Sequence, residues 1–257
     1  MPETRQLWPS SPAKSRVLAH GESIPAHHHL DGQLVYAATG VLTVSTAHGS
    51  WIAPATRAVW TPPGHEHWHR AYGITDMRIL RLPASVAADI SARLPGQPVV
   101  VAVSPLLREV LLALTTPRAQ HLTAKDHLLH VAVAEFVGAP EQPLHLPEPN
   151  DDRLSAATNL LHADPANPVT LTQLGRAIGA SERTLSRLFH DELGMSFRQW
   201  RTQLRLHHAL VLLASGQQVS DVAIACGWAN PTSLIAAFSL AVGQTPARYQ
   251  AALKSAG

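Results

Sequence analysis

Residues 181–200 read SERTLSRLFHDELGMSFRQW, and this stretch decides the fold of the last third of the chain. Ser181 is a favourable N-cap, because its hydroxyl can accept a hydrogen bond from a backbone N–H of the first helical turn. Leu185, Leu188 and Phe189 follow at helical spacing and predict one apolar face. The remaining positions give the opposite face the side chains Glu182, Arg183, Thr184, Ser186 and Arg187. The stretch therefore predicts an amphipathic helix with a polar surface that carries two arginines.

The residues just before this helix predict a shorter helix and a tight turn. Thr170 and Gln173 have the spacing of a capping box, in which the two side chains bond backbone N–H groups at the start of a helix. Gly179 suits a left-handed turn, which costs glycine little. We expect the small Ala177 to let the second helix approach closely. The predicted core-facing residues of the first helix are Leu171, Leu174 and Ile178. Together these features predict a helix-turn-helix unit.

The same unit occurs twice in the last third of the chain. After the turn, an offset of 49 residues aligns Leu185 with Leu234, Phe189 with Phe238, Gly194 with Gly243, Ser196 with Thr245 and Trp200 with Tyr249. Before the turn, an offset of 48 residues aligns Leu171 with Val219, Leu174 with Val222, Ala177 with Ala225 and Gly179 with Gly227. The difference of one residue falls in the turn, where a change of length is tolerated. In the second copy, Asn230 or Pro231 is expected to begin the second helix.

Between the two copies, residues 196–215 predict one continuous helix that carries Arg198, Arg201 and Arg205. About 20 residues at 1.5 Å each span roughly 30 Å. Successive major-groove faces of a DNA duplex lie roughly 34 Å apart. The spacing therefore lets one chain read two adjacent turns of a duplex. The alternative is an all-helical packing module that binds no ligand.

Residues 181–200, followed by VSDVAIACGW at 219–228 and GQTPARY at 243–249, resemble the DNA-binding domain of AraC/XylS-type transcription regulators. The resemblance covers about 100 residues. It implies base-reading positions of the first unit at Arg183, Thr184, Ser186 and Arg187. It implies those of the second unit at Pro231, Thr232, Ser233, Ile235 and Ala236. Arginine can bond guanine bidentately, and serine and threonine can bond bases or phosphates.

The second unit departs from the family pattern. Its recognition helix has Ala236 and Ser239 where the family usually has an arginine and a lysine. Its DNA contacts must then be weak or depend on Asn230, Thr232 and Ser233, so we predict that the first unit carries most of the specificity. The predicted DNA-binding residues are Arg183, Thr184, Ser186, Arg187, Arg198, Asn230, Thr232 and Ser233.

The first half of the chain has a different pattern. Residues 17–82 form short alternating runs between Pro and Gly breaks and predict strands. Residues 104–137 carry apolar side chains at helical spacing and predict two helices. Residues 138–149 contain four prolines and predict a linker, because proline fixes φ and removes a hydrogen-bond donor. We predict an α+β fold with a sensor β-barrel at 1–103, a helical segment at 104–137, a linker at 138–150 and an all-α domain of two helix-turn-helix units at 151–257.

Histidines in the predicted barrel are spaced like metal ligands. The pattern runs Gly21, His27-His28-His29, Gln33 and Gly40, and then Pro62-Pro63-Gly64 and His67. It resembles the two motifs of the cupin barrel, in which two histidines, an acid and a later histidine hold a metal. The resemblance implies the ligand set His27, His29, Gln33 and His67. The sequence departs from the motifs in having Gln33 for a glutamate, Thr56 for a glycine and Ala71 for an asparagine.

His27 and His29 are expected to alternate on one strand and to point into the barrel together. Gln33 and His67 are expected to arrive from neighbouring strands, and His69 is expected at the rim or facing outward, like His65. Three imidazoles and a weak amide oxygen suit a divalent transition metal such as Zn, Ni or Fe. The alternative is a metal-free barrel whose histidines bond one another, water or an organic effector.

Composition and charge agree with a folded protein that binds nucleic acid. Of the 257 residues, 46% are hydrophobic and 15% are charged. The formal net charge of +2 comes from residues 151–257, where nine basic side chains face seven acidic ones, since residues 1–150 have eleven of each. The single cysteine, Cys226, excludes an internal disulfide and fits a reducing compartment. No apolar run is long enough to span a membrane, so we expect a cytoplasmic protein without a membrane partner.

These observations predict a sequence-specific DNA-binding transcription regulator, not an enzyme, whose activity depends on a small effector or metal in the barrel. The family resemblance implies promoter or operator DNA and RNA polymerase as partners. It also implies a homodimer formed through residues 104–137, although those helices can equally pack on the barrel. The alternative function is a cupin metalloenzyme with a helical appendage. The missing glutamate argues against it, and it would leave the helical repeat without a purpose.

Overall fold

The computed structural model describes residues 13–91, 94, 96–116, 123–140 and 144–254. Contacts divide the chain into two compact units. One unit comprises Met1–Thr46 and Trp51–Pro143, and the other comprises Ala47–Ser50 and Leu144–Gly257. The helices expected within 104–137 belong to the first unit, and the second unit begins inside the segment that we expected to be a linker.

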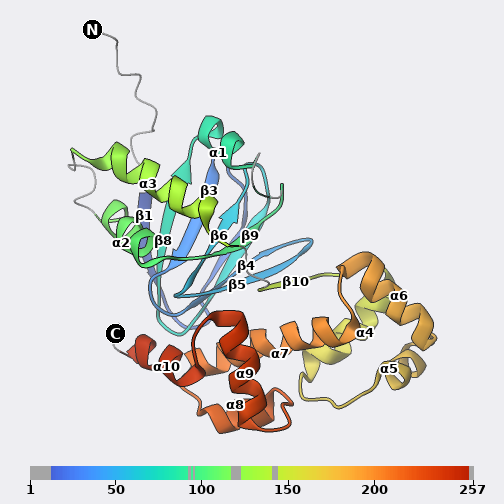
Figure 1. The fold of residues 1–257 in the computed structure, drawn as a ribbon. Coiled ribbons are helices and arrows are strands. Elements are labelled where there is room, and N and C mark those ends of the chain that lie inside the picture. The colour runs from blue at the N-terminus through green and yellow to red at the C-terminus, as the bar shows by residue number, and fades with distance from the viewer. Residues whose placement is uncertain (1–12, 92–93, 95, 117–122, 141–143, 255–257) are drawn as a thin grey trace. The chain divides into compact units, whose positions relative to one another are not determined.

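Strands dominate the first part of the chain, as the alternating sequence predicts. They are β1 (Ala13–Leu18), β2 (Ser23–His27), β3 (Gly32–Ala37), β4 (Val41–Thr46), β5 (Gly49–Pro54), β6 (Arg57–Thr61), β7 (His67–Tyr72), β8 (Thr75–Leu82), β9 (Val99–Ala102) and β10 (His145–Pro147). Among the described residues they form two sheets of five, in the orders β1-β8-β3-β6-β9 and β10-β5-β4-β7-β2. Figure 1 shows these strands followed by helices, which confirms the α+β prediction.

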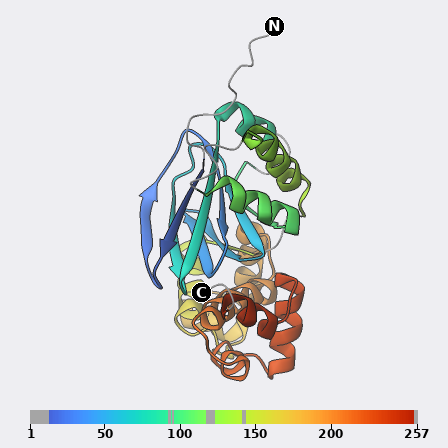
Figure 2. The ribbon, with the colours of Figure 1, turned by 90° about the vertical axis from the view of Figure 1, so that its left-hand side faces the viewer.

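Every residue of β3 is buried, so both faces of the first sheet are covered at this central strand. Leu34 lies opposite Trp60 of β6 and Leu80 of β8, and all three join a core that includes Phe136. The helices of this unit are α1 (Ala84–Ser91), α2 (Pro105–Leu114) and α3 (Lys125–Gly138), and each contributes residues to that core. Figures 1 and 2 show them on one side of the strands. Alternate residues of β3, beginning with Gln33, therefore point to the opposite face, toward the second sheet.

The second unit is helical apart from β10 and the segment Ala47–Ser50, where β5 begins. Its helices are α4 (Asp152–Ala163), α5 (Leu171–Ile178), α6 (Glu182–Leu193), α7 (Phe197–Ala214), α8 (Val219–Ala225), α9 (Pro231–Val242) and α10 (Pro246–Lys254). The long α7 confirms the single helix predicted over 196–215. It contacts α6 toward one end and α8 and α10 toward the other (Figure 1). Within the described ranges, no helix combines the length and apolar character that crossing a bilayer requires.

Capping interactions fix where these helices begin and end. The predicted capping box is present at α5, where the Thr170 and Gln173 side chains bond each other's backbone N–H groups. Gly179 ends α5 with φ at 73°, a left-handed conformation that suits glycine. The Ser181 side chain caps α6, and the Asn230 side chain caps α9. These observations confirm the helix boundaries that the sequence predicted.

One packing prediction is wrong. We expected Ala177 to permit the close approach of α5 and α6, but Ala177 is exposed. Gly175 has that role, because it is buried and a Cβ added to it would lie 2.5 Å from the backbone oxygen of Ala180. Two residues along a helix turn the side chain by about 200°, to nearly the opposite side. A small residue was therefore correctly expected in this helix but assigned to the wrong face.

Candidate functional site

The outer face of α6 lines a groove in the surface of the helical unit. The groove has a volume of about 1110 Å³. It is lined by Glu182, Arg183, Thr184, Ser186, Arg187, His190, Asp191, Gly194, Met195, Ser196 and Gln199. Leu185 and Phe189, on the other face of α6, are completely buried. The helix thus presents one polar, solvent-facing side, as an element that enters the major groove requires.

Four of the predicted DNA-binding residues lie together in this groove. Arg183, Ser186 and Arg187 are exposed, whereas Thr184 is half-buried. The Thr184 hydroxyl lies 2.8 Å from the Ser181 hydroxyl, and its backbone N–H donates to the same oxygen. Thr184 therefore belongs to the helix cap, and the two arginines and Ser186 are the side chains that extend into solvent.

The three arginines of α7 divide into two groups. Arg198 is exposed at the start of the helix, outside the residues that line the groove. Arg201 donates to the Val169 carbonyl at 2.8 Å, and its guanidinium lies 4.9 Å from the ring centre of Phe197. Arg205 donates to the carbonyl of Pro165 at 3.0 Å. Arg201 and Arg205 therefore hold the segment between α4 and α5 against α7, and Arg198 is the one directed to solvent.

The second recognition helix presents an uncharged surface. Its exposed positions include Thr232, Ile235 and Ala236, which the offset of 49 residues aligns with Arg183, Ser186 and Arg187 of α6. The other two residues of this unit that were predicted to bind DNA, Asn230 and Ser233, are engaged in hydrogen bonds within the protein. The Asn230 side-chain oxygen accepts from the Ser233 backbone N–H at 2.9 Å and from the Ser233 hydroxyl at 3.1 Å. Asn230 and Ser233 thus make the cap of α9.

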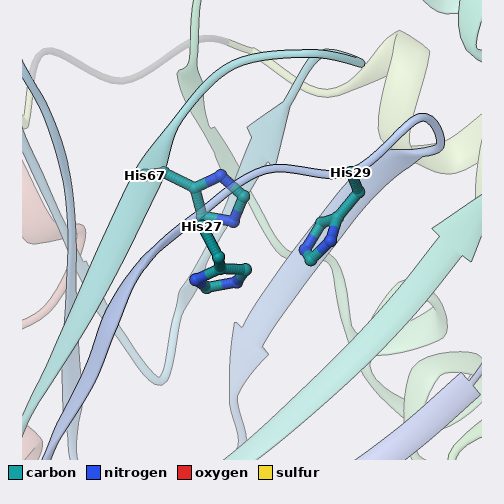
Figure 3. Close-up of side chains that lie close together, drawn as sticks. All are labelled: His27, His29 and His67. Carbon is teal, nitrogen blue, oxygen red and sulfur yellow. The ribbon is translucent and has the colours of Figure 1, made fainter.

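Three histidines converge in the first unit (Figure 3). Ring nitrogens of His27, His29 and His67 all lie within 4.8 Å of one another. His67 is on β7, the neighbour of β2, as expected. His29 lies beyond the end of β2, and the pairing with β7 is irregular between Ile24 and His27, so the expectation that His27 and His29 alternate on one strand is wrong. The two rings nevertheless reach the same site.

Gln33 reaches the cluster from the opposite sheet, not from a neighbouring strand as expected. Its side-chain nitrogen lies 3.4 Å from Nε2 of His67 and 3.5 Å from Nε2 of His69. The prediction that His69 faces outward is wrong, because its side chain is buried and its ring centre lies 5.1 Å from that of His67. The period of two on β7 that directs His67 inward also directs His69 inward, so the signal was present in the sequence.

Backbone carbonyls fix the protonation of two rings. His27 Nδ1 lies 2.7 Å from the carbonyl of Pro25, and His67 Nδ1 lies 2.8 Å from the carbonyl of His65. A carbonyl can only accept, so Nδ1 carries the proton in each ring and Nε2 keeps its lone pair. Metal-binding histidines are oriented in the same way. Nε2 of His29 is buried and has no hydrogen-bond partner among the described residues.

The cluster favours neutral imidazoles. Burial, together with a smaller effect of the neighbouring histidines, lowers the pKa of His67 to about 4 and that of His69 to about 3. Burial also lowers the pKa of His29. Neutral rings with available lone pairs are the form that binds a metal ion. The donors His27, His29 and His67 therefore fit a divalent transition metal, with Gln33 beside them.

Two helix-turn-helix units joined by one long helix, in a chain that also has a separate β-rich unit, define the class of a DNA-binding transcription regulator with a ligand-binding domain. Comparisons with known proteins agree. Residues 15–132 match the family described as AraC-like ligand binding domain, and residues 174–252 match the one described as helix-turn-helix domain. The chain belongs to the AraC family of transcription regulators, and it is not an enzyme.

Two curated relatives agree with this assignment. The HTH-type transcriptional regulator NimR of Escherichia coli (strain K12) is 35% identical over 233 residues, which are 89% of this chain and 83% of NimR. The HTH-type transcriptional regulator RipA of Corynebacterium glutamicum is 36% identical over 115 residues, 44% of this chain and 34% of RipA. Among solved structures, ToxT from Vibrio cholerae with a bound unsaturated fatty acid covers 95% of both chains at 12% identity and a TM-score of 0.40.

Proposed function

We propose that this regulator binds operator DNA mainly through α6 and that a small effector or metal ion held by the histidine cluster modulates this binding. The observation that carries the DNA half is the groove in which Arg183 and Arg187 are exposed over a buried apolar face. The observation that carries the effector half is the convergence of three imidazoles, two of them with Nδ1 fixed by a carbonyl.

On DNA, Arg183 and Arg187 would contact base edges in one major groove, where arginine pairs bidentately with guanine. Ser186 would contact a base or a phosphate, and Arg198 would contact the backbone. The 18 residues of α7 span about 27 Å. That length would place α9 near the next major-groove face, where Thr232 is the exposed polar side chain on its first turn.

In the β-rich unit, His27, His29 and His67 would hold a metal such as Zn, Ni or Fe. Gln33 would be a weak fourth ligand only through its amide oxygen, so its side chain, whose nitrogen faces His67 and His69, would have to turn over. A bound metal would supply a positive charge and fixed bonds that join the end of β2 to β7. A ligand shifts a conformational equilibrium only if its affinities for the two conformations differ. The metal must therefore have different affinities for the conformation that binds DNA and for the one that does not.

Two further partners belong to the proposal. We expect a homodimer through α2 and α3, since Leu106 on α2 is 53% exposed and Val131 on α3 is 36% exposed although both helices already pack on the sheet. Sedimentation of the Leu106→Glu variant tests this, because the substitution would disrupt a dimer interface but would not change the mass of a monomer.

We also expect the regulator to recruit RNA polymerase, which transcription with purified components would measure.

Genome-wide footprinting of the full-length chain tests the function as a whole. It should recover a limited set of sites that share one sequence motif, and Arg187→Ala should lose most of them.

Elemental analysis of the purified protein tests the metal separately. Roughly one Zn, Ni or Fe per chain, absent from the His27→Ala/His67→Ala variant, is the expected result, and a metal content unchanged by that variant would exclude this site.

A further inference from the structure

Arg81 on β8 is a half-buried arginine without a partner. Its Nε is buried, and its side chain has no hydrogen bond or ion pair to any residue that the structure describes. The other described arginines that are not exposed all donate to a protein oxygen: Arg57 to Thr56, Arg78 to Asp76 and Thr115, Arg201 to Val169, and Arg205 to Pro165. An unpaired cation in a partly buried place costs folding free energy, so its retention calls for a partner from outside the chain.

The position of Arg81 places that partner at the histidine cluster. Gln33 on β3 lies directly opposite Arg81 on β8 and directly opposite Thr61 on β6. Residues directly opposite each other on paired strands share a face of the sheet. Gln33 contacts His67 and His69, so this row of three polar residues faces the imidazoles.

Thr61 supplies an independent observation. Its side chain is only 1% exposed, and its hydroxyl has no hydrogen-bond partner among the described residues. A buried hydroxyl without a partner is costly and uncommon in folded proteins. Two unsatisfied donors, one neutral and one cationic, thus flank Gln33 on the face that it presents to the histidines.

The charges around this row favour an anion. The positive charge of Arg81 reaches the cluster, since it lowers the pKa of His29 after the larger effect of burial, while Asp31 acts in the opposite direction. Asp31 forms no ion pair with Arg81. A guanidinium presents a planar fork that matches a carboxylate bidentately. One cation and one hydroxyl suit a single negative charge better than a phosphate monoester, which carries nearly two at neutral pH.

We infer that the site binds the carboxylate of a small organic molecule, with Arg81 as its counter-ion and the Thr61 hydroxyl as a hydrogen-bond donor. This inference rests on the proposed function, in which the β-rich unit holds the effector. It adds the chemical class of that effector, and it assigns two residues, Arg81 and Thr61, that are not among the ligand positions of the cupin motifs.

Thermal unfolding of the full-length chain tests the inference with simple probes. The melting temperature is measured in acetate, in chloride at the same ionic strength, in inorganic phosphate, and with neutral acetamide, which has nearly the shape of acetate. Each is recorded for the wild type, Arg81→Met, Arg81→Lys and Thr61→Val, with Arg70→Met as a control that removes an exposed arginine from β7. All are measured both in a chelator and with Zn²⁺.

Acetate at several times its dissociation constant should raise the melting temperature of the wild type by about 2–4 °C over chloride and acetamide. The rise should persist in Arg70→Met, shrink in Arg81→Lys and Thr61→Val, and vanish in Arg81→Met. An equal rise in Arg81→Met and wild type would overturn the inference, as would no rise at all or a larger effect of phosphate. A rise that needs Zn²⁺ and ignores Arg81 would assign the carboxylate to the metal and also overturn it.

The outcome is separable from the proposed function. Footprinting and metal analysis report on operator binding and on His27, His29 and His67, and neither depends on Arg81 pairing with a carboxylate. If the operator is bound and the metal is present but acetate has no Arg81-dependent effect, this inference alone fails.

Discussion

His207 on α7 is a buried imidazole in the helical unit, and its environment makes stability depend on pH. Its pKa is lowered to about 3, mainly by burial and to a smaller extent by His208, His145 and His162, although a hydrogen bond to the Leu144 carbonyl raises it. In the unfolded chain the pKa of a histidine is about 6.5. The folded state therefore excludes a proton that the unfolded state binds. The contribution of the neutral His207 to the free energy of unfolding is fully present above about pH 6.5 and is lost as the pH falls toward 3.

We predict that lowering the pH from 7 to 5 costs the wild type about 2 kcal/mol more free energy of unfolding than it costs His207→Gln. Glutamine retains a donor for the Leu144 carbonyl but does not titrate. Urea unfolding followed by circular dichroism at 222 nm measures the difference. His190→Gln, at an exposed position on α6, is the control and should behave like the wild type. Equal pH dependence in all three proteins would show that His207 does not control acid stability.

Gly175 on α5 gives a second prediction at the scale of one residue. A Cβ at this position would lie 2.5 Å from the Ala180 oxygen, which is backbone and cannot rotate away. Gly175→Ala should therefore lower the free energy of unfolding by about 1–3 kcal/mol, although alanine is the better helix former. Gly138→Ala is the control, since its added Cβ meets nothing within 4 Å. A Gly175→Ala variant as stable as the control would mean that α5 and α6 are packed less closely.

At the scale of elements, α6 and α9 are two copies of one helix with different surfaces. The sequence predicted their existence, caps and buried faces, because helical periodicity and capping residues are local signals. The structure adds that Asn230 and Ser233 are engaged in the cap of α9, so that helix has fewer groups for DNA than its sequence suggests.

This asymmetry leads to a prediction about operator affinity. Arg187→Ala should weaken binding to the footprinted operator by about 10- to 100-fold, since a bidentate guanine contact contributes about 1–3 kcal/mol. Ser233→Ala should weaken it much less, because its hydroxyl already donates to Asn230. Fluorescence anisotropy with labelled operator measures both constants. An equal loss in the two variants would refute the idea that α6 dominates recognition.

In the β-rich unit, only part of the candidate site could be predicted from the sequence. The resemblance to the cupin motifs identified His27, His29 and His67, and the structure brings these three together. It missed His69, although the alternation of β7 contained the signal, and it had no means of finding Arg81. Arg81 is significant only because β8 pairs with β3 in one particular register, and a register between strands about 50 residues apart is set by the packed sheet, not by a local motif.

At the scale of the whole molecule, a regulator that binds operator DNA binds a polyanion. Operator affinity should fall steeply with salt, because each phosphate contact releases condensed counterions. Arg198→Ala should reduce the slope of log K against log salt by about one, since its exposed guanidinium would contact the backbone. Replacing Arg201, which donates a hydrogen bond to the Val169 carbonyl, should lower the free energy of unfolding and not change this slope. Binding that is independent of salt would contradict the assignment.

The most direct test of the central claim, that two linked units read one duplex, is hydroxyl-radical footprinting of a single operator by the full-length chain. For each bound chain we predict two protected segments centred about 10 base pairs apart, one helical turn, as the length of α7 requires. In Arg183→Ala/Arg187→Ala, protection of the segment read by α6 should be the first to disappear. One protected segment per chain, or two at a spacing other than a whole turn, would contradict the account.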